Sequence, residues 1–127
     1  MHEMVENFRN DPQKASKYFV KELAYTLGPV ELKELSEKND VKIIDVRHMA
    51  DYDIAHIPMA ISIPYEELEG RLNELNKEDL HVVYCYNAYC HLALRAAALM
   101  AHHEIPVMVL CGGFKVWTEE FRFATEK

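Results

Sequence analysis

The stretch His81–Ala98 constrains the fold of this chain more than any other. It begins with HVVY, a β-branched and aromatic run typical of a buried strand, and Cys85 follows where that strand should end. A short loop then leads into an alanine-rich apolar run that predicts a packed helix over about His91–His103. Helix N-termini and free loop N–H groups favour negative charge. The position therefore predicts a Cys85 thiolate with a lowered pKa, the alternative being an inert buried cysteine.

Length and charge limit the classes of protein that this chain can belong to. Its 127 residues have room for one hydrophobic core, and a net charge of −7 argues against nucleic acid or an anionic membrane as partner. No apolar run approaches the length of a membrane span, and the first residues do not resemble a signal peptide. Three cysteines make an odd count, which does not fit a fully paired disulfide framework. We therefore expect a cytoplasmic protein with reduced thiols.

The N-terminal residues predict a helical extension over 1–28, ahead of the main domain at 29–127. Met1–Asn10 shows a weak helical pattern, and Asp11 followed by Pro12 is a good helix start. Apolar side chains then recur at helical spacing up to Leu23. We expect this amphipathic helix to pack on one face of the domain; packing against a second subunit is the alternative.

Short apolar runs alternate with helical segments through the rest of the chain. This alternation predicts βα units and an α/β fold with a parallel sheet. The expected strands are 41–46, 60–63, 81–84 and 107–110, and the expected helices are 30–35, 51–54, 65–75, 91–103 and a last one after Gly113 that carries Phe114, Trp117 and Phe121.

Chemically active side chains cluster where these strands end. In a parallel sheet the ligand site lies beyond the carboxyl ends of the strands. That rule brings Arg47, Cys85 and Cys111 to one edge, if the strands are assigned correctly. For Asp45 and Arg47 we favour a structural role, a charge-assisted hydrogen bond that holds loops, over direct catalysis.

The order of motifs resembles that of a rhodanese domain. The run IIDVRHMADYDIAHIPMAISIP is similar to the first half of that family, and VVYC, the alanine-rich helix and VLCGGFKVW are similar to its second half. The resemblance implies a five-stranded parallel sheet with helices on both faces. It also implies that Cys85 is the nucleophile that carries sulfur. The N-terminal helix and the Cys-x4-Cys loop resemble a subset of small single-domain members with a second cysteine.

Sulfur transfer suits the residues of the loop itself. A thiolate attacks a sulfane sulfur and holds it as a persulfide, and successive backbone N–H groups can stabilise the outer sulfur. We expect the loop to bind substrate mainly through its backbone, with the two tyrosines shaping the mouth or packing the loop. The loop residues are Tyr86, Asn87, Ala88, Tyr89, Cys90 and His91.

The loop departs from the family pattern at its end, where many members have a basic residue and this chain has Cys90. No Lys or Arg lies between Cys85 and Arg95. We therefore expect thiosulfate to be a poor donor. A loop this short, without a closing Arg, also argues against phosphatase chemistry. Cys90 is a possible resolving thiol, with Cys111 as a competitor and simple packing as the alternative.

Three functions remain open after this reading. The first is a sulfurtransferase or sulfur carrier that works between a small-molecule sulfur donor and a thiol or other thiophilic acceptor, as a monomer or weak homodimer. The second is a dithiol redox protein that cycles a disulfide between Cys85 and Cys90, and the third is a non-catalytic binding module.

No cofactor is implied. We expect His56 to be a structural hydrogen-bonding residue. No metal site is predicted, because the histidines lack ligand spacing and Cys85, Cys90 and His91 lack a fourth ligand; those histidines are His2, His48, His81, His102 and His103.

Overall fold

Five parallel strands form the sheet in the part of the chain that this computed structural model describes, residues 3, 6 and 9–127. Their order is β1-β5-β4-β2-β3, and every neighbouring pair runs parallel. The predicted α/β fold with a five-stranded parallel sheet is thus confirmed. The strands are β1 (Thr26–Leu27), β2 (Lys42–Asp45), β3 (Ile61–Ser62), β4 (His81–Tyr84) and β5 (Val107–Leu110).

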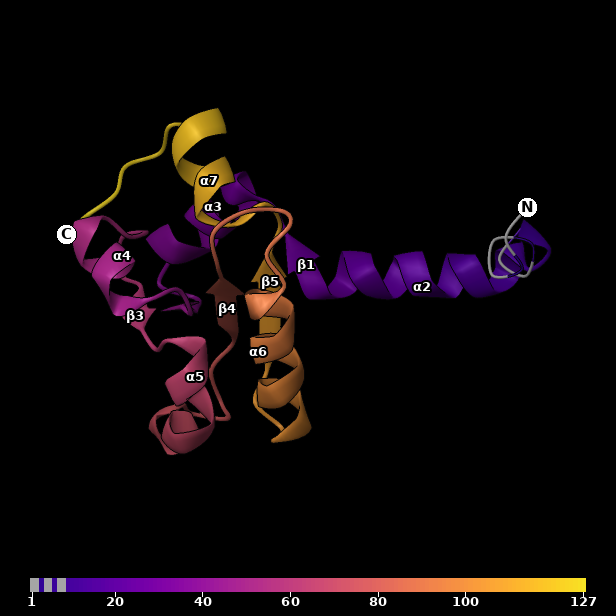
Figure 1. The fold of residues 1–127 in the computed structure, drawn as a ribbon, viewed down its shortest axis with the longest axis horizontal. Helices are drawn as coiled ribbons and strands as arrows, with labels where there is room; N and C mark the ends of the chain where they lie inside the picture. The colour runs from indigo at the N-terminus through magenta and orange to yellow at the C-terminus, as the bar shows by residue number, and fades with distance from the viewer. Residues whose placement is uncertain (1–2, 4–5, 7–8) are drawn as a thin grey trace.

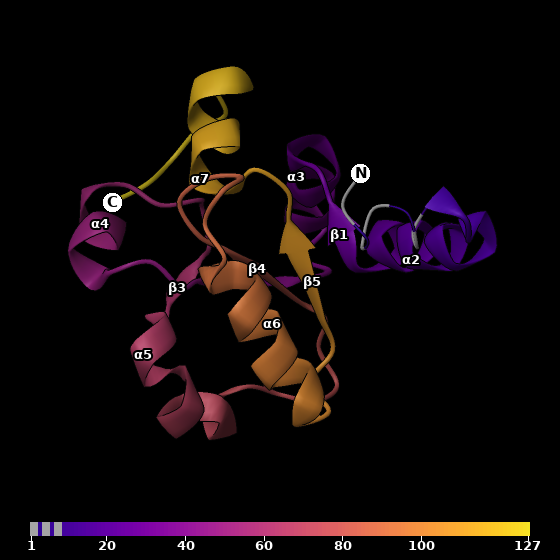
Figure 2. The ribbon, with the colours of Figure 1, turned by 45° about the vertical axis from the view of Figure 1, so that its right-hand side comes forward.

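Helices cover both faces of this sheet, as Figures 1 and 2 show. Most segments agree with the expected ones, but the chain after α5 continues as a 3-10 helix and the C-terminal helix continues as a π-helix. The elements are α2 (Pro12–Tyr25), α3 (Pro29–Glu37), α4 (Met49–Ile54), α5 (Tyr65–Leu68), η1 (Glu69–Glu74), α6 (Leu92–His102), α7 (Gly113–Lys115) and η2 (Val116–Glu120).

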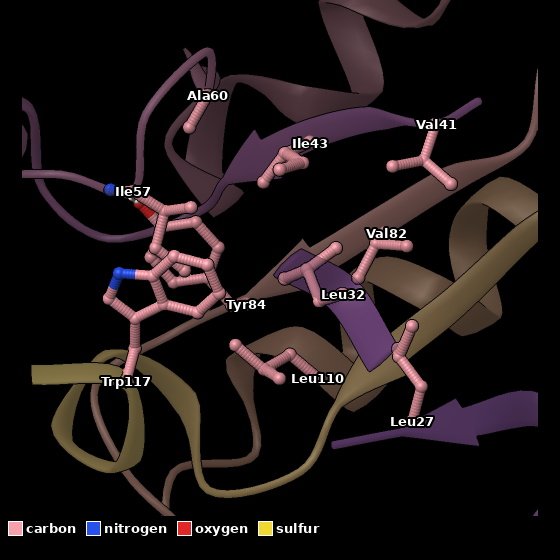
Figure 3. Packing of buried hydrophobic residues seen from close by; sticks show 10 residues of the cluster. All are labelled: Leu27, Leu32, Val41, Ile43, Ile57, Ala60, Val82, Tyr84, Leu110 and Trp117. Atoms are coloured by element: carbon pink, nitrogen blue, oxygen red, sulfur yellow. Dashed lines mark hydrogen bonds between the residues drawn. The ribbon is translucent and has the colours of Figure 1, made fainter. Parts of the chain in front are cut away.

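The central strand β4 is buried on both faces. Val82 and Tyr84 belong to the apolar cluster under α3 and the C-terminal helix, whereas Val83 and Cys85 belong to the cluster under α5 and α6. Alternate residues of a strand point to opposite faces, so one strand supplies both halves of the core. Figure 3 shows the first cluster, in which Trp117 packs near Tyr84 and Ile57.

Helix α2 begins where the sequence predicts. The carboxylate of Asp11 accepts a hydrogen bond from the Lys14 N–H at 3.1 Å, and Pro12 occupies the first helical position. The prediction that this helix packs on the domain is wrong, however. None of its residues is buried, and Figure 1 shows it projecting away from the sheet beyond β1. The weak helical pattern of Met1–Asn10 falls largely outside the described residues, as does His2.

Candidate functional site

The candidate site is the loop between β4 and α6, which begins at Cys85. The Cys85 side chain is buried, Cys90 near the end of the loop is half-buried, and Tyr89 at its tip is 90% exposed. Cys111 follows β5 and is exposed. The strand, the loop and the helix therefore lie as the sequence predicts (Figure 2).

Hydrogen bonds inside the loop curl it back on itself. Asn87 accepts the Tyr89 N–H on its side chain at 2.9 Å and the Cys90 N–H on its carbonyl at 3.2 Å. The Cys85 thiol donates to the Cys90 carbonyl at 3.3 Å, which joins the two ends of the loop. The N–H groups of Tyr89 and Cys90 are therefore engaged within the loop and are not free to bind the outer sulfur as the backbone of the loop is expected to do.

The two thiols of the loop have opposite pKa shifts. Burial, followed by a hydrogen bond with Cys90, raises the pKa of Cys85 from 9.0 to about 11, although the N–H groups of Ala93 and Tyr86 favour its anion. Burial also opposes ionisation of Cys90, but its hydrogen bond with Cys85, backbone N–H groups and the charge of Arg95 outweigh burial and lower its pKa. The predicted lowering of the Cys85 pKa is thus wrong for the resting pair. The two shifts favour the proton on Cys85 over the proton on Cys90 when the pair ionises.

A buried network beneath the loop joins Asp45, Arg47 and Tyr84. The Arg47 guanidinium donates to both carboxylate oxygens of Asp45 at 2.8–3.1 Å and to the Ala55 carbonyl at 2.7 Å. The Tyr84 hydroxyl donates to Asp45 at 2.6 Å and accepts the Ile57 N–H at 3.1 Å. Asp45 and Arg47 therefore form the expected structural ion pair. Sequence reasoning missed Tyr84, since a tyrosine in an apolar strand gives no sign of its partner.

Tyr86 ties the loop to the chain after β2. Its hydroxyl donates to the Asp51 carboxylate at 2.5 Å and accepts the His48 N–H at 3.2 Å. The Arg47 guanidinium lies 5.7 Å from the centroid of its ring and 4.0 Å from that of Phe114. Tyr86 is thus held by packing and hydrogen bonds at one wall of the site. The Tyr89 hydroxyl, in contrast, makes no hydrogen bond to the described part of the chain.

The glycine pair at the start of α7, Gly112 and Gly113, supports the loop from the other side. Gly113 has φ of +62°, and a Cβ there would lie 2.6 Å from the Cys85 carbonyl oxygen and 2.9 Å from the Asn87 nitrogen. The next two residues donate backbone hydrogen bonds to the loop, Phe114 to Cys85 at 2.8 Å and Lys115 to Tyr86 at 3.0 Å. The close approach requires glycine. The GG of the sequence was the available signal, but its contact with the loop was not predicted.

His56 contacts structural partners rather than the loop thiols. Its Nδ1 lies 2.9 Å from the Tyr52 carbonyl oxygen, its ring stacks on that of Tyr52 at 3.7 Å, and its backbone pairs with Glu126. This agrees with the expected structural role. Across residues 3, 6 and 9–127, no three His, Cys, Asp or Glu side chains are grouped so as to hold a metal ion.

Fold and site together define a class: a parallel α/β domain that presents a cysteine in a curled loop between its central strand and a helix. Comparison with known proteins identifies the family. The family model of the rhodanese-like domain matches residues 28–120, and the chain belongs to this family.

Three similar proteins illustrate the range of the family. The thiosulfate sulfurtransferase GlpE of Coxiella burnetii is 32% identical over 72% of this chain and 84% of its own length. The HTH-type transcriptional regulator Rv0324 of Mycobacterium tuberculosis is 38% identical over 68% of this chain, which spans only 38% of that regulator. The crystal structure of BH2092 from Bacillus halodurans has a TM-score of 0.81 at 32% identity, covering 91% of this chain and 85% of that one.

The described helices also bear on membrane association. Within residues 3, 6 and 9–127, none combines the length and the apolar character that crossing a bilayer requires.

Proposed function

We propose that this protein is a sulfurtransferase that carries sulfane sulfur as a persulfide on Cys85. The observation that carries the proposal is the position of the Cys85 thiol, buried at the end of β4 inside a loop whose other end supplies a second thiol. Membership of the rhodanese-like family, with a thiosulfate sulfurtransferase among its relatives, supports the same chemistry.

The proposed reaction needs no cofactor and no external oxidant. The Cys85 sulfur attacks the sulfane sulfur of a persulfide R–S–SH, and a new S–S bond forms as the bond to the donor thiolate breaks. The electron pair of the broken bond leaves with R–S⁻. A thiolate acceptor then attacks the outer sulfur, which restores the Cys85 thiolate and gives a new persulfide on the acceptor.

Cys85 must lose its proton before it attacks, because the thiolate is the nucleophile. The lowered pKa of Cys90 makes its thiolate a suitable acceptor for that proton, and the Cys85 thiol already donates to the Cys90 carbonyl at 3.3 Å. The N–H groups of Tyr86 in the loop and of Ala93 in the first turn of α6 stabilise the anion formed on Cys85. Asn87, Ala88, Tyr89 and His91 would contribute backbone and surface to the bound donor.

A second function is favoured by the hydrogen bond from the Cys85 thiol to the Cys90 carbonyl, which brings the two cysteines together. The Cys90 thiolate attacks the inner sulfur of the Cys85 persulfide, a Cys85–Cys90 disulfide forms, and HS⁻ leaves with the electron pair of the broken bond. Two electrons from low-molecular-weight thiols then reduce the disulfide. In this version Cys90 is a resolving thiol and the protein is a dithiol redox protein that releases sulfide.

Intact mass after treatment with cysteine persulfide tests these functions against each other. A gain of one sulfur that is absent in Cys85→Ser supports the carrier, whereas loss of two hydrogens with sulfide release supports the dithiol cycle. Peptide mapping identifies the linkage and separates a Cys85–Cys90 bond from one to Cys111. An unchanged mass refutes both chemistries and leaves the binding module.

A further inference from the structure

Helix α2 exposes large apolar side chains that nothing in the described chain covers. Tyr18, Phe19, Leu23 and Tyr25 are 58–78% exposed, although they lie on a helix of 14 residues. A helix of this length is marginal in water without tertiary packing. Because α2 stands away from the sheet in Figure 1, its own domain does not supply that packing.

An apolar cleft of about 730 Å³ lies between α2 and the domain. Tyr18 and Tyr25 form one wall, and Leu94, Ala98 and Ala101 of α6 form the other. These α6 residues recur at intervals of four and three and are exposed, so they make a narrow apolar stripe in which two of the three side chains are small. Such a stripe allows another helix to approach closely.

The cleft also reaches a partly open edge of the sheet. The short strand β1 pairs with β5 only at Val109 and Leu110, and Val107, earlier in β5, is half-buried and lines the cleft. Open strand edges in soluble proteins are commonly covered by a helix or a loop. A helix seated in this cleft would cover the edge.

Charge identifies α2 itself as a suitable occupant. Pro12–Tyr25 carries three lysines and one glutamate, a net charge of +2, whereas the whole chain carries −7, which leaves −9 on all other residues. A basic helix with an apolar stripe thus complements an acidic domain with an apolar cleft.

The extension is also a shared feature of a solved relative. The residues from Thr26 onward make up about 80% of this chain, but the match to BH2092 covers 91% of it, so part of the N-terminal helix is matched as well. The N-terminal helix is therefore not peculiar to this chain.

We propose that the cleft takes the α2 helix of a second copy of this chain, with the two copies exchanging helices about a two-fold axis. The partner's α2 inserts the face that carries Phe19 and Leu23, which do not line the cleft of their own copy. A helix of 14 residues is about 21 Å long, comparable to the 11-residue α6 that it lies beside. Because each copy gives its α2 to the cleft of the other, the dimer contains two identical helix–cleft interfaces, as two-fold symmetry requires.

Molecular mass in solution tests the proposal directly. Sedimentation equilibrium of the full chain, over a hundredfold range of concentration, should give about twice the monomer mass of 14.8 kDa at the upper end. Leu23→Glu on the helix and Ala98→Glu in the cleft should each yield monomers. Both positions are exposed, so neither change disturbs the folded monomer. Ile54→Glu on α4, at a position 69% exposed, is the matched control and should still dimerise.

Mixing the two monomeric variants separates helix exchange from pairing of α2 with α2. The Ala98→Glu copy keeps an intact helix and the Leu23→Glu copy keeps an intact cleft, so an equimolar mixture should regain dimers through one of the two interfaces. A wild-type protein that stays monomeric at the highest concentration overturns the proposal. So does a mixture that remains monomeric, or dimerisation that survives both single changes.

Discussion

Gly113→Ala should loosen the candidate site without touching any reacting atom. The added Cβ would lie 2.6 Å from the Cys85 carbonyl oxygen, 2.9 Å from the Asn87 nitrogen and 3.0 Å from the Tyr86 carbonyl carbon. All three atoms are backbone, so the loop or α7 must move. The φ of +62° itself costs an L-residue roughly 1–2 kcal/mol.

The movement also threatens two backbone hydrogen bonds. Phe114 donates to Cys85 at 2.8 Å and Lys115 donates to Tyr86 at 3.0 Å. Each such bond contributes about 0.5–1.5 kcal/mol net. Together with the backbone strain, we expect the free energy of unfolding to fall by about 2–5 kcal/mol.

Urea unfolding measures this loss, and the rate of sulfur loading on Cys85 measures its effect on the site. Gly70→Ala is the matched control, because nothing lies within 4 Å of a Cβ at that position. That variant should be neutral or more stable by about 0.4–1 kcal/mol. If Gly113→Ala unfolds at the wild-type midpoint and loads sulfur at the wild-type rate, the support of the loop by α7 is wrong.

Three further predictions test other parts of the site. Tyr84→Phe removes two hydrogen bonds in the core, one from the Ile57 N–H and one to the Asp45 carboxylate, so the free energy of unfolding should fall by about 1–3 kcal/mol. A variant as stable as wild type in urea would refute this role of Tyr84. Alkylation of Cys85, followed by peptide mapping, should speed up as the pH rises toward about 11, because the raised pKa keeps the thiol protonated below that value. Cys90→Ala removes the hydrogen bond that helps to raise the pKa of Cys85, so the inflection of the alkylation rate should move to lower pH. An inflection that stays in place or moves to higher pH contradicts the coupling of the two thiols. Thiosulfate should have a kcat/KM at least about tenfold below that of cysteine persulfide, since the loop has no basic residue to bind its charge and a missing charge-assisted hydrogen bond costs about 1.5–3 kcal/mol. Steady-state kinetics in which thiosulfate is the preferred donor would overturn this expectation.

Local sequence patterns predicted the sheet and the loop well because their causes are local. The run HVVY predicts a strand at 81–84 and the alanine-rich run predicts a helix close to Leu92–His102, and the structure confirms both. The two-residue strand β1 was missed, since Thr26–Leu27 is too short to show any periodicity.

Features that depend on distant residues were not predictable in the same way. Tyr84 and Asp45 lie side by side only because β2 and β4 pair in that register. The pKa of Cys85 depends on burial and on Cys90, whereas the sequence indicated only its place before a helix. The apolar spacing of α2 predicted an amphipathic helix, but not that the chain carries this helix away from its own domain with its apolar side chains exposed.

The central claim is that Cys85 carries the transferred sulfur. Intact mass spectrometry after treatment with cysteine persulfide, of wild type and of Cys85→Ser, tests it most directly, with circular dichroism to show that both proteins are folded. The account predicts a gain of one sulfur in wild type that peptide mapping assigns to Cys85 and that the serine variant lacks. An equal gain in the serine variant, or a sulfur mapped to Cys90 or Cys111 instead, would contradict it.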